Sequence, residues 1–179
     1  MAASLRVVAG SAGGRRLSAP AGRRLRPTSE RVREAVFASL GSLGAVEGAT
    51  VLDLFAGTGA MGIEALSRGA ARVTFVDDDP VAVGTISANL ATTGFSPWAT
   101  VVQGDAVRFL DGCRETFDVA LADPPYAFDG WREVLARLRA RLAVLESGSV
   151  IELGPGWEAV RTRRYGDTVV TLARPCSRG

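Results

Sequence analysis

The sequence predicts an α/β fold built on a doubly wound, mostly parallel sheet of seven strands. From residue 50 onward, short apolar runs alternate with segments of helical periodicity, which is typical of strands covered by helices on both faces. A glycine-rich loop follows the first apolar run, and the last two strand-like runs flank a two-residue turn that predicts an antiparallel pair. The 179 residues are enough for one such domain.

Residues 1–27 are expected to form a basic arm, and residues 28–179 the domain that contains the sheet. Within the arm, short runs at 5–8 and 16–18 flank the glycine-rich stretch 10–14. Two such runs around a glycine turn predict a β-hairpin.

The first helix is expected to follow the arm, with Thr28 or Ser29 as its N-cap. The apolar residues that come next recur every three or four positions, so this helix should bury one face. Arg31, Arg33 and Glu34 lie between those positions and are expected to point away from the core.

The alternating region assigns the remaining elements in order. The expected strands are 50–54, 72–76, 100–102, 117–122, 149–153, 159–165 and 168–173. The expected helices are 60–67, 81–91, 106–110 and 131–142. Five strands would be parallel, and the last two would return as a hairpin at one edge of the sheet.

Composition excludes several classes of chemistry. The chain contains no histidine, so no imidazole can act as a base, a triad member or a metal ligand, and no metal site is expected. All 21 basic residues are arginine, which excludes lysine chemistry as well. Cys113 and Cys176 are interpreted as ordinary thiols. No apolar run has the length of a membrane span or signal peptide, so a cytoplasmic protein is expected.

Charge is distributed unevenly along the chain. Residues 1–33 carry eight arginines and one acid, whereas residues 34–179 carry 13 arginines and 18 acids. A basic arm on a mildly acidic body favours a polyanionic partner that is reached through the arm. The leading candidates for phosphate contacts are Arg15, Arg16, Arg23, Arg24 and Arg26. A second cluster, Arg161, Arg163 and Arg164, is interpreted as a solvated strand edge.

The strongest motif is a glycine loop between the first strand and the next helix. Gly57, Gly59 and Gly62 match G-x-G-x-x-G, in which the glycines allow a tight turn, close ligand approach and close packing of the helix on the strand. Asp77 lies 20 residues after Gly57, at the end of the second strand, where a carboxylate can bind both hydroxyls of a ribose.

Carboxylates beside the loop discriminate between two adenosine-containing cofactors. Asp53 precedes the loop and Asp123 ends the fourth strand, so a pyrophosphate there would be repelled. A ligand with an ammonium and a sulfonium suits the same surroundings, which favours S-adenosylmethionine. The expected cofactor-binding residues are Asp53, Phe55, Ala56, Gly57, Thr58, Gly59, Asp77, Asp78, Asp105 and Ala106.

Two further aspartates near the strand ends have capping interpretations. Asp79 precedes Pro80 and is expected to be a helix N-cap with proline at the first helical position. Asp105 could lie near the adenine amino group or could cap the helix that follows, and the sequence favours neither.

The motif Asp123-Pro124-Pro125-Tyr126 follows the fourth strand. The two prolines fix the backbone and remove two donors, which leaves carbonyls directed into the site. The Asp123 carboxylate and such a carbonyl can accept both hydrogens of a planar amino group, and the Tyr126 ring can stack on a base. These four residues are the expected catalytic set.

Taken together, these motifs resemble the class I amino-methyltransferases, a Rossmann-like fold, and most closely the bacterial RsmD family of 16S rRNA (guanine-N2)-methyltransferases. The resemblance covers nearly the whole chain. It is carried by RVVAG at 6–10, GRRL at 14–17, RPTSERVRE at 26–34, LFAGTGAMGIEALSRGA at 54–70 and DPPY at 123–126. The TSER stretch departs from the TTDR usual in that family.

The resemblance implies methylation of a guanine N2 in 16S rRNA, within the small ribosomal subunit or an assembly intermediate, by a protein expected to be monomeric. The residues themselves leave alternatives open. Adenine-N6 methylation of RNA or DNA uses the same four-residue motif, and a protein glutamine methyltransferase would have asparagine in place of Asp123. A non-catalytic RNA-binding protein with a disused cofactor fold is the third alternative.

Overall fold

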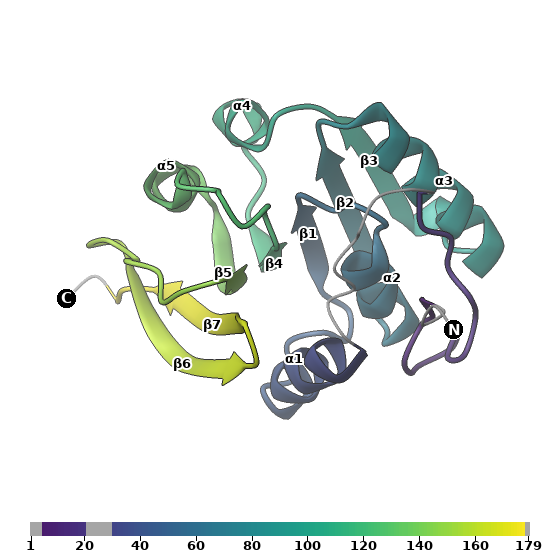
Figure 1. Cartoon of the computed structure of the whole chain (residues 1–179), viewed down its shortest axis with the longest axis horizontal. Helices are drawn as coiled ribbons and strands as arrows, with labels where there is room; N and C mark the ends of the chain where they lie inside the picture. Colours follow the sequence, from purple (N-terminus) through teal and green to yellow (C-terminus); the bar gives the residue numbers. More distant parts are fainter. Residues whose placement is uncertain (1–4, 21–29, 178–179) are drawn as a thin grey trace.

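The computed structural model describes residues 5–20 and 30–177 (Figure 1). Its helices are α1 (Glu30–Ser42), α2 (Ala60–Ser67), α3 (Pro80–Thr93), α4 (Ala106–Gly112) and α5 (Trp131–Arg137), with a 3-10 turn η1 (Ser96–Trp98). Its strands are β1 (Thr50–Leu54), β2 (Arg72–Asp77), β3 (Ala99–Gln103), β4 (Phe117–Ala122), β5 (Ala140–Ser147), β6 (Trp157–Tyr165) and β7 (Thr168–Pro175).

The strands form one seven-stranded sheet in the order β3-β2-β1-β4-β5-β7-β6. Strands β1 to β5 are parallel, and β7 pairs antiparallel with both β5 and β6. The predicted α/β class and the closing antiparallel hairpin are therefore confirmed. The chain order reverses between β1 and β4, and open parallel sheets bind ligands at the carboxyl ends of strands beside such a reversal.

Helices cover both faces of the sheet (Figure 1). One core cluster joins α1, α2 and α3 to the sheet through side chains such as Phe37, Ile63 and Ile86. The other joins α4 and α5 to the opposite face, with Leu110 and Val134 at its centre. Among the described residues, no helix is long and apolar enough to cross a bilayer.

The sequence misplaced the fifth strand. The predicted helix 131–142 ends at Arg137, the strand begins at Ala140, and the predicted strand 149–153 is irregular. The stretch 137–142 alternates arginine with leucine or alanine, a period of two that fits an extended chain as well as a helix. Pairing with β4, where Val119 lies opposite Leu142, decides for the strand.

Arg33 also differs from the prediction, because its side chain is fully buried rather than directed to solvent. Its Nε lies 3.6 Å from Oε2 of Glu64, which is equally buried on α2. Burial lowers the pKa of the Arg33 guanidinium, while the Glu64 carboxylate raises it. Long arginine side chains are buried where a carboxylate neutralises them, and helical periodicity does not reveal that partner.

The arm is packed on the body rather than separate from it. Its described part makes one antiparallel bridge, between Arg6 and Arg16, in place of a full hairpin of strands. Val7, Ala12 and Leu17 belong to the core cluster of α1 and α2. The predicted boundary at residue 27 and the predicted N-cap at residues 28 or 29 lie outside the described residues.

Candidate functional site

The carboxyl ends of β1, β2 and β4 bring the predicted motifs to one edge of the sheet. Asp53 is paired in register with Phe75 of β2 and with Leu121 of β4. The glycine loop leaves β1 one residue later, and Asp123 follows Ala122 at the end of β4. The two predicted motifs are therefore neighbours in the fold, although they are about 70 residues apart in the chain.

At two positions of the loop the structure requires glycine. Gly59, the residue before α2, has φ 75°, a left-handed conformation that glycine adopts without strain. A Cβ at Gly62 would lie 2.3 Å from a ring carbon of Phe75 and 2.8 Å from a methyl of Val73. Only glycine therefore lets α2 lie this close to β2, as the motif predicts.

Phe55 begins the loop in a strained conformation. It has φ 58°, and it is the only residue other than glycine with positive φ in the described chain. Its ring meets Phe128 edge to face at 5.0 Å, and Phe128 meets Trp131 at 5.4 Å. Strain at a non-glycine residue is maintained only where the surroundings enforce it, and this aromatic series holds the loop against the segment after Tyr126.

Asp77 supports the loop from β2. Its Oδ2 accepts from the N–H of Gly57 at 2.8 Å, and its Oδ1 accepts from the N–H of Asp79 at 3.0 Å. The carboxylate is half-buried and therefore remains accessible at the strand end. Asp78, next to it, is exposed.

Asp53 is a buried carboxyl group beneath the loop. Its Oδ2 accepts from the N–H of Gly62 at 2.8 Å, inside the first turn of α2. Burial raises the pKa of this carboxyl well above its ordinary value, and the charges of Asp123 and Asp77 raise the pKa further. The N–H of Gly62 acts in the opposite direction without reversing the shift. Burial and like charge thus both disfavour the charged form of Asp53, and a cation bound beside it would favour that form.

The capping expectations are resolved by the hydrogen bonds. Asp79 accepts from the N–H of Val81 and precedes Pro80 at the start of α3, as predicted. Asp105 accepts from the N–H of Arg108 at 2.9 Å and is the N-cap of α4, which Ala106 begins. Of the two interpretations left open for Asp105, the structure shows the capping one.

The Asp-Pro-Pro-Tyr segment is a turn in which one proline carbonyl already accepts a backbone hydrogen bond. Pro124 is buried and Asp123 exposed. The carbonyl of Pro125 accepts from the N–H of Phe128 at 2.9 Å, so it is not one of the free carbonyls that the sequence predicted for the site. The chain makes a tight turn toward α5, and the hydrogen bond of that turn is accepted by the carbonyl of Pro125.

Tyr126 is 54% exposed at the mouth of the site. Its ring lies on Gly148, since a Cβ at Gly148 would come within 2.8 Å of the ring atoms Cδ1 and Cε1. Gly148 follows β5, so the same error that misplaced the strand concealed this contact from the sequence. Phe128 and Trp131 were also missed, although three aromatic side chains within the six residues 126–131 were a usable signal.

Asn89 of α3 is a further residue that the sequence did not indicate. Its buried side chain accepts from the N–H of Ser18 at 2.7 Å and donates to the carbonyls of Ser18 and Thr58. One amide therefore connects the arm to the glycine loop.

The predicted RNA-binding arginines are only partly described. Arg15 and Arg16 are exposed, and Nη1 of Arg15 donates to the carbonyl of Thr92 at 2.8 Å. Arg23, Arg24 and Arg26 lie outside the described residues. Across residues 5–20 and 30–177, no three acidic or sulfur-containing side chains gather in a way that could hold a metal ion.

Comparison with known proteins agrees with this geometry. Residues 5–174 match the model of the family named "Conserved hypothetical protein 95", the RsmD family of methyltransferases. The chain belongs to this family. A proposed rRNA methyltransferase of Bacillus subtilis, YlbH, is 39% identical over 93% of this chain and 91% of its own length.

A sequence and a solved structure from Escherichia coli are similar as well. The chain is 38% identical to ribosomal RNA small subunit methyltransferase D over 68% of this chain, which spans 60% of that protein. Among solved structures, a proposed methyltransferase, YhhF, superposes with a TM-score of 0.86 at 31% identity and covers 98% of this chain and 99% of its own. These relatives agree with the class I methyltransferase fold predicted from the sequence.

Proposed function

We propose that the protein transfers a methyl group from S-adenosylmethionine to the exocyclic N2 of a guanine in 16S rRNA. One observation carries this proposal. The acidic, glycine-lined strand ends lie beside the Asp-Pro-Pro-Tyr turn, so a cationic methyl donor and a planar amino group would meet at one edge of the sheet. The membership in a methyltransferase family and the rRNA methyltransferase names of its relatives support the same reaction.

The donor site is assigned to the glycine loop and its carboxylates. In this proposal the backbone from Phe55 to Gly59 lies against the donor, and Asp77 binds the ribose hydroxyls while it holds Gly57. The buried charge of Asp53 attracts the ammonium and sulfonium groups. Asp78 and Ala106 would flank the adenine, and Asp105 would act there by shaping the start of α4.

The acceptor site is assigned to the turn after β4. The base is taken out of its stack, which any enzyme acting on a paired or stacked base requires. Asp123 and the carbonyl of Pro124 accept the two amino hydrogens and turn the nitrogen lone pair toward the methyl carbon. Tyr126 stacks on the base, and Pro125 fixes the turn. As the nitrogen–carbon bond forms, the carbon–sulfur bond breaks, and the amino proton leaves to the Asp123 carboxylate or to solvent.

Catalysis in this arrangement depends on position and charge. The bound S-adenosylmethionine supplies an activated methyl group. The protein places the amino nitrogen in line with it and removes water from between them, which contributes to the rate through orientation and a preorganised electric field.

The proposed partner is 16S rRNA in the small ribosomal subunit or in an assembly intermediate, met by a cytoplasmic, monomeric enzyme. The arm arginines, Arg15 and Arg16 among them, would contact phosphates. Each neutralised phosphate releases counterions, so RNA affinity should fall steeply with salt concentration.

The deciding experiment offers labelled S-adenosylmethionine with small subunits, free rRNA, DNA or release factor, followed by digestion and analysis of the labelled product. Label in N2-methylguanine from rRNA or subunits supports the proposal. Label in N6-methyladenine would show that the target base is adenine rather than guanine. Label in glutamine would show that the substrate is a protein rather than a nucleic acid. Absence of transfer to all four by a protein that binds the donor would overturn the proposed function.

A further inference from the structure

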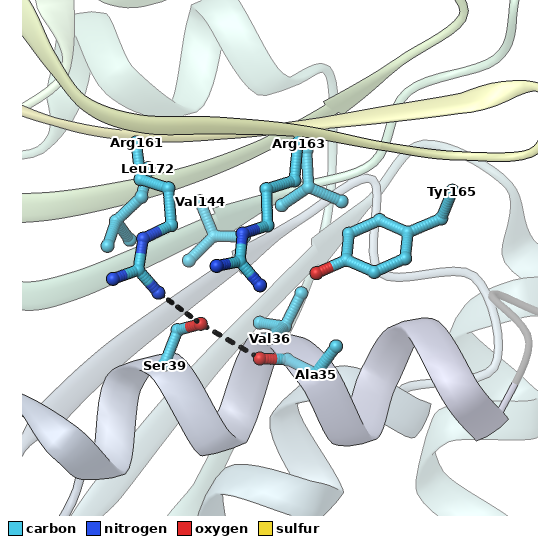
Figure 2. A pocket seen from close by; sticks show the side chains of 9 residues that line it. Ala35, Val36, Ser39, Val144, Arg161, Arg163, Tyr165 and Leu172 are labelled. Carbon is cyan, nitrogen blue, oxygen red and sulfur yellow. Dashed lines mark hydrogen bonds between the residues drawn. The ribbon is translucent and has the colours of Figure 1, made fainter.

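A groove lies outside the site just described, between α1 and the C-terminal hairpin (Figure 2). Its volume, including the part open to solvent, is about 320 Å³, and its floor is apolar, with Val36 of α1 and Val144 of β5. Arg161, Arg163 and Tyr165 reach into it from β6, toward the helix. The sequence interpreted this arginine cluster as a solvated edge, but the structure places two of its members over a concave surface.

The register of the sheet connects this groove to the acceptor site. Ala122 pairs with Leu145, so the next row across the sheet contains Asp123, Glu146 of β5, Val170 of β7 and Arg163 of β6. Arg163 is thus three strand spacings from Asp123, about 14 Å at about 4.8 Å per spacing. Arg161 is two residues away along β6, opposite Leu172, and lies further from the sheet edge that carries Asp123.

The groove opens on the face of the sheet that also holds the donor site. Val144 and Leu172 belong to the core cluster of α1, α2 and α3, as do Val51 and Leu121, which are two residues from Asp53 and Asp123. Side chains alternate between faces along a strand, so Asp53 lies on this same face. An RNA strand that leaves the acceptor site along this face would meet the groove within a few nucleotides.

The two arginines retain most of their donors for a ligand. Nη1 of Arg161 reaches Oγ of Ser39 at 3.5 Å, the outer limit of a hydrogen bond, and that hydroxyl donates to the carbonyl of Ala35 (Figure 2). Arg163 makes no ion pair or hydrogen bond with any residue of the described ranges. Arginine stems often cover apolar surface, but here both cationic heads also converge on one groove.

We propose that this groove binds the phosphodiester backbone of the RNA substrate a few nucleotides from the target base, an inference that rests on the proposed function. Arg161 and Arg163 pair with phosphate oxygens, for which the guanidinium fork is well suited. The apolar floor and the half-buried Tyr165 ring lie against the sugar next to them. The basic arm would then contact one part of the RNA and the groove another.

The test compares two variants of the whole protein that remove arginines from opposite faces of β6. R161Q/R163Q removes both groove charges, whereas R164Q removes the adjacent charge, which alternation places on the other face. Binding of a fluorescent 16S rRNA fragment is measured between 50 and 200 mM salt, and methylation kinetics are measured on the same RNA. A charge-preserving variant, R161K/R163K, and thermal melting of every variant show whether the fold is intact.

For R161Q/R163Q we expect the slope of log K against log salt to become shallower by about 1.4, or about 0.7 for each lost phosphate. KM for RNA should rise about tenfold, with kcat and donor affinity nearly unchanged, because the groove acts on binding alone. R164Q should change the slope by less than about 0.3, and R161K/R163K should keep most of the wild-type slope.

An unchanged slope in R161Q/R163Q, or an equal loss in R164Q, would overturn the proposed groove while the proposed function stands. If the wild-type protein binds rRNA through the groove but transfers no methyl group, the proposed function is overturned and the proposed groove stands. A protein that binds no rRNA at any salt concentration overturns both.

Discussion

At the scale of single residues, the site is governed by where carboxylates are placed and how well they are solvated. Asp53 is buried, Asp77 is half-buried and bonded through both oxygens, and Asp123 is exposed. The three lie at adjacent strand ends, and the charges of Asp123 and Asp77 add to the burial that raises the pKa of Asp53. Such a set destabilises the empty protein and favours a cation, which is the usual relation between a binding site and stability.

Replacing Asp53 by Asn should therefore stabilise the unliganded protein and weaken donor binding. The raised pKa of Asp53 means that its destabilising effect is fully present above the folded-state pKa and is lost as the pH falls below the ordinary value. We expect a Tm about 2–4 °C higher at pH 8, equivalent to about 1 kcal/mol for a chain of this size, and no gain at pH 4.

Calorimetric titration with S-adenosylmethionine completes this test. Wild-type affinity should weaken as the pH falls through the pKa of Asp53, whereas the Asn variant should bind weakly at every pH. Equal affinities of the two proteins at pH 8 would contradict the assignment of Asp53 to the donor site.

Replacing Asp123 should impair catalysis and leave donor binding nearly unchanged. Asp123→Ala removes the proposed acceptor of an amino hydrogen, so kcat should fall at least about 100-fold, as for the loss of one preorganised partner in other active sites. The Kd for S-adenosylmethionine should change less than about threefold. Asp129→Ala is the matched control, an exposed acid in the following loop with no assigned role. A Kd that rises in step with the lost rate would make Asp123 a donor ligand instead.

At the scale of elements, the sequence predicts best where a pattern is local. Strand Thr50–Leu54, helix Ala60–Ser67 and strand Phe117–Ala122 have their predicted bounds, because each combines a mostly apolar run or a helical face with a nearby glycine or proline. β5 failed because its first residues fit two periods and only pairing with β4 decides between them.

The candidate site shows the same division. Its motifs were visible in the chain, but the contact of Gly148 with Tyr126 depends on the end of β5 and needed the fold. The burial of Arg33 was hidden for the same reason, since its carboxylate partner is 31 residues away on another helix.

Gly148→Ala tests whether that contact matters for the acceptor base. The added Cβ would lie 2.8 Å from two atoms of the Tyr126 ring, and the ring is exposed enough to move away. Melting should therefore change little, whereas kcat/KM for RNA should fall about tenfold, near the lower end of the stacking energy of about 1–3 kcal/mol.

The control for this variant is Gly156→Ala, since a Cβ at Gly156 meets nothing within 4 Å. Tyr126→Ala should lose at least as much kcat/KM as Gly148→Ala. Wild-type kinetics in Gly148→Ala would show that the position of the Tyr126 ring does not limit the reaction.

At the scale of the whole molecule, a buried polar network holds the arm to the body. Glu64 of α2 accepts from the N–H groups of Val8 and Ala9 at 2.7 and 3.0 Å and from Nε of Arg68 at 2.7 Å. Arg33 of α1 completes the network at 3.6 Å. Together with Asn89, which connects the arm to the glycine loop, this network makes the position of the arm, which we propose contacts RNA, depend on the helices beside the candidate donor site.

The network predicts that two acidic residues, both bonded to the arm, differ greatly in their contribution to the free energy of unfolding. Glu64→Gln removes the negative charge beside the buried Arg33, and an uncompensated buried charge costs about 3–5 kcal/mol, so the free energy of unfolding in urea should fall by that amount. Glu30→Gln breaks the exposed pair with Arg6, which water already screens, and should leave the urea midpoint nearly unchanged. If both variants unfold at the wild-type midpoint, the buried pair of Glu64 and Arg33 does not stabilise the fold, and the arm is held by its apolar residues and its other hydrogen bonds.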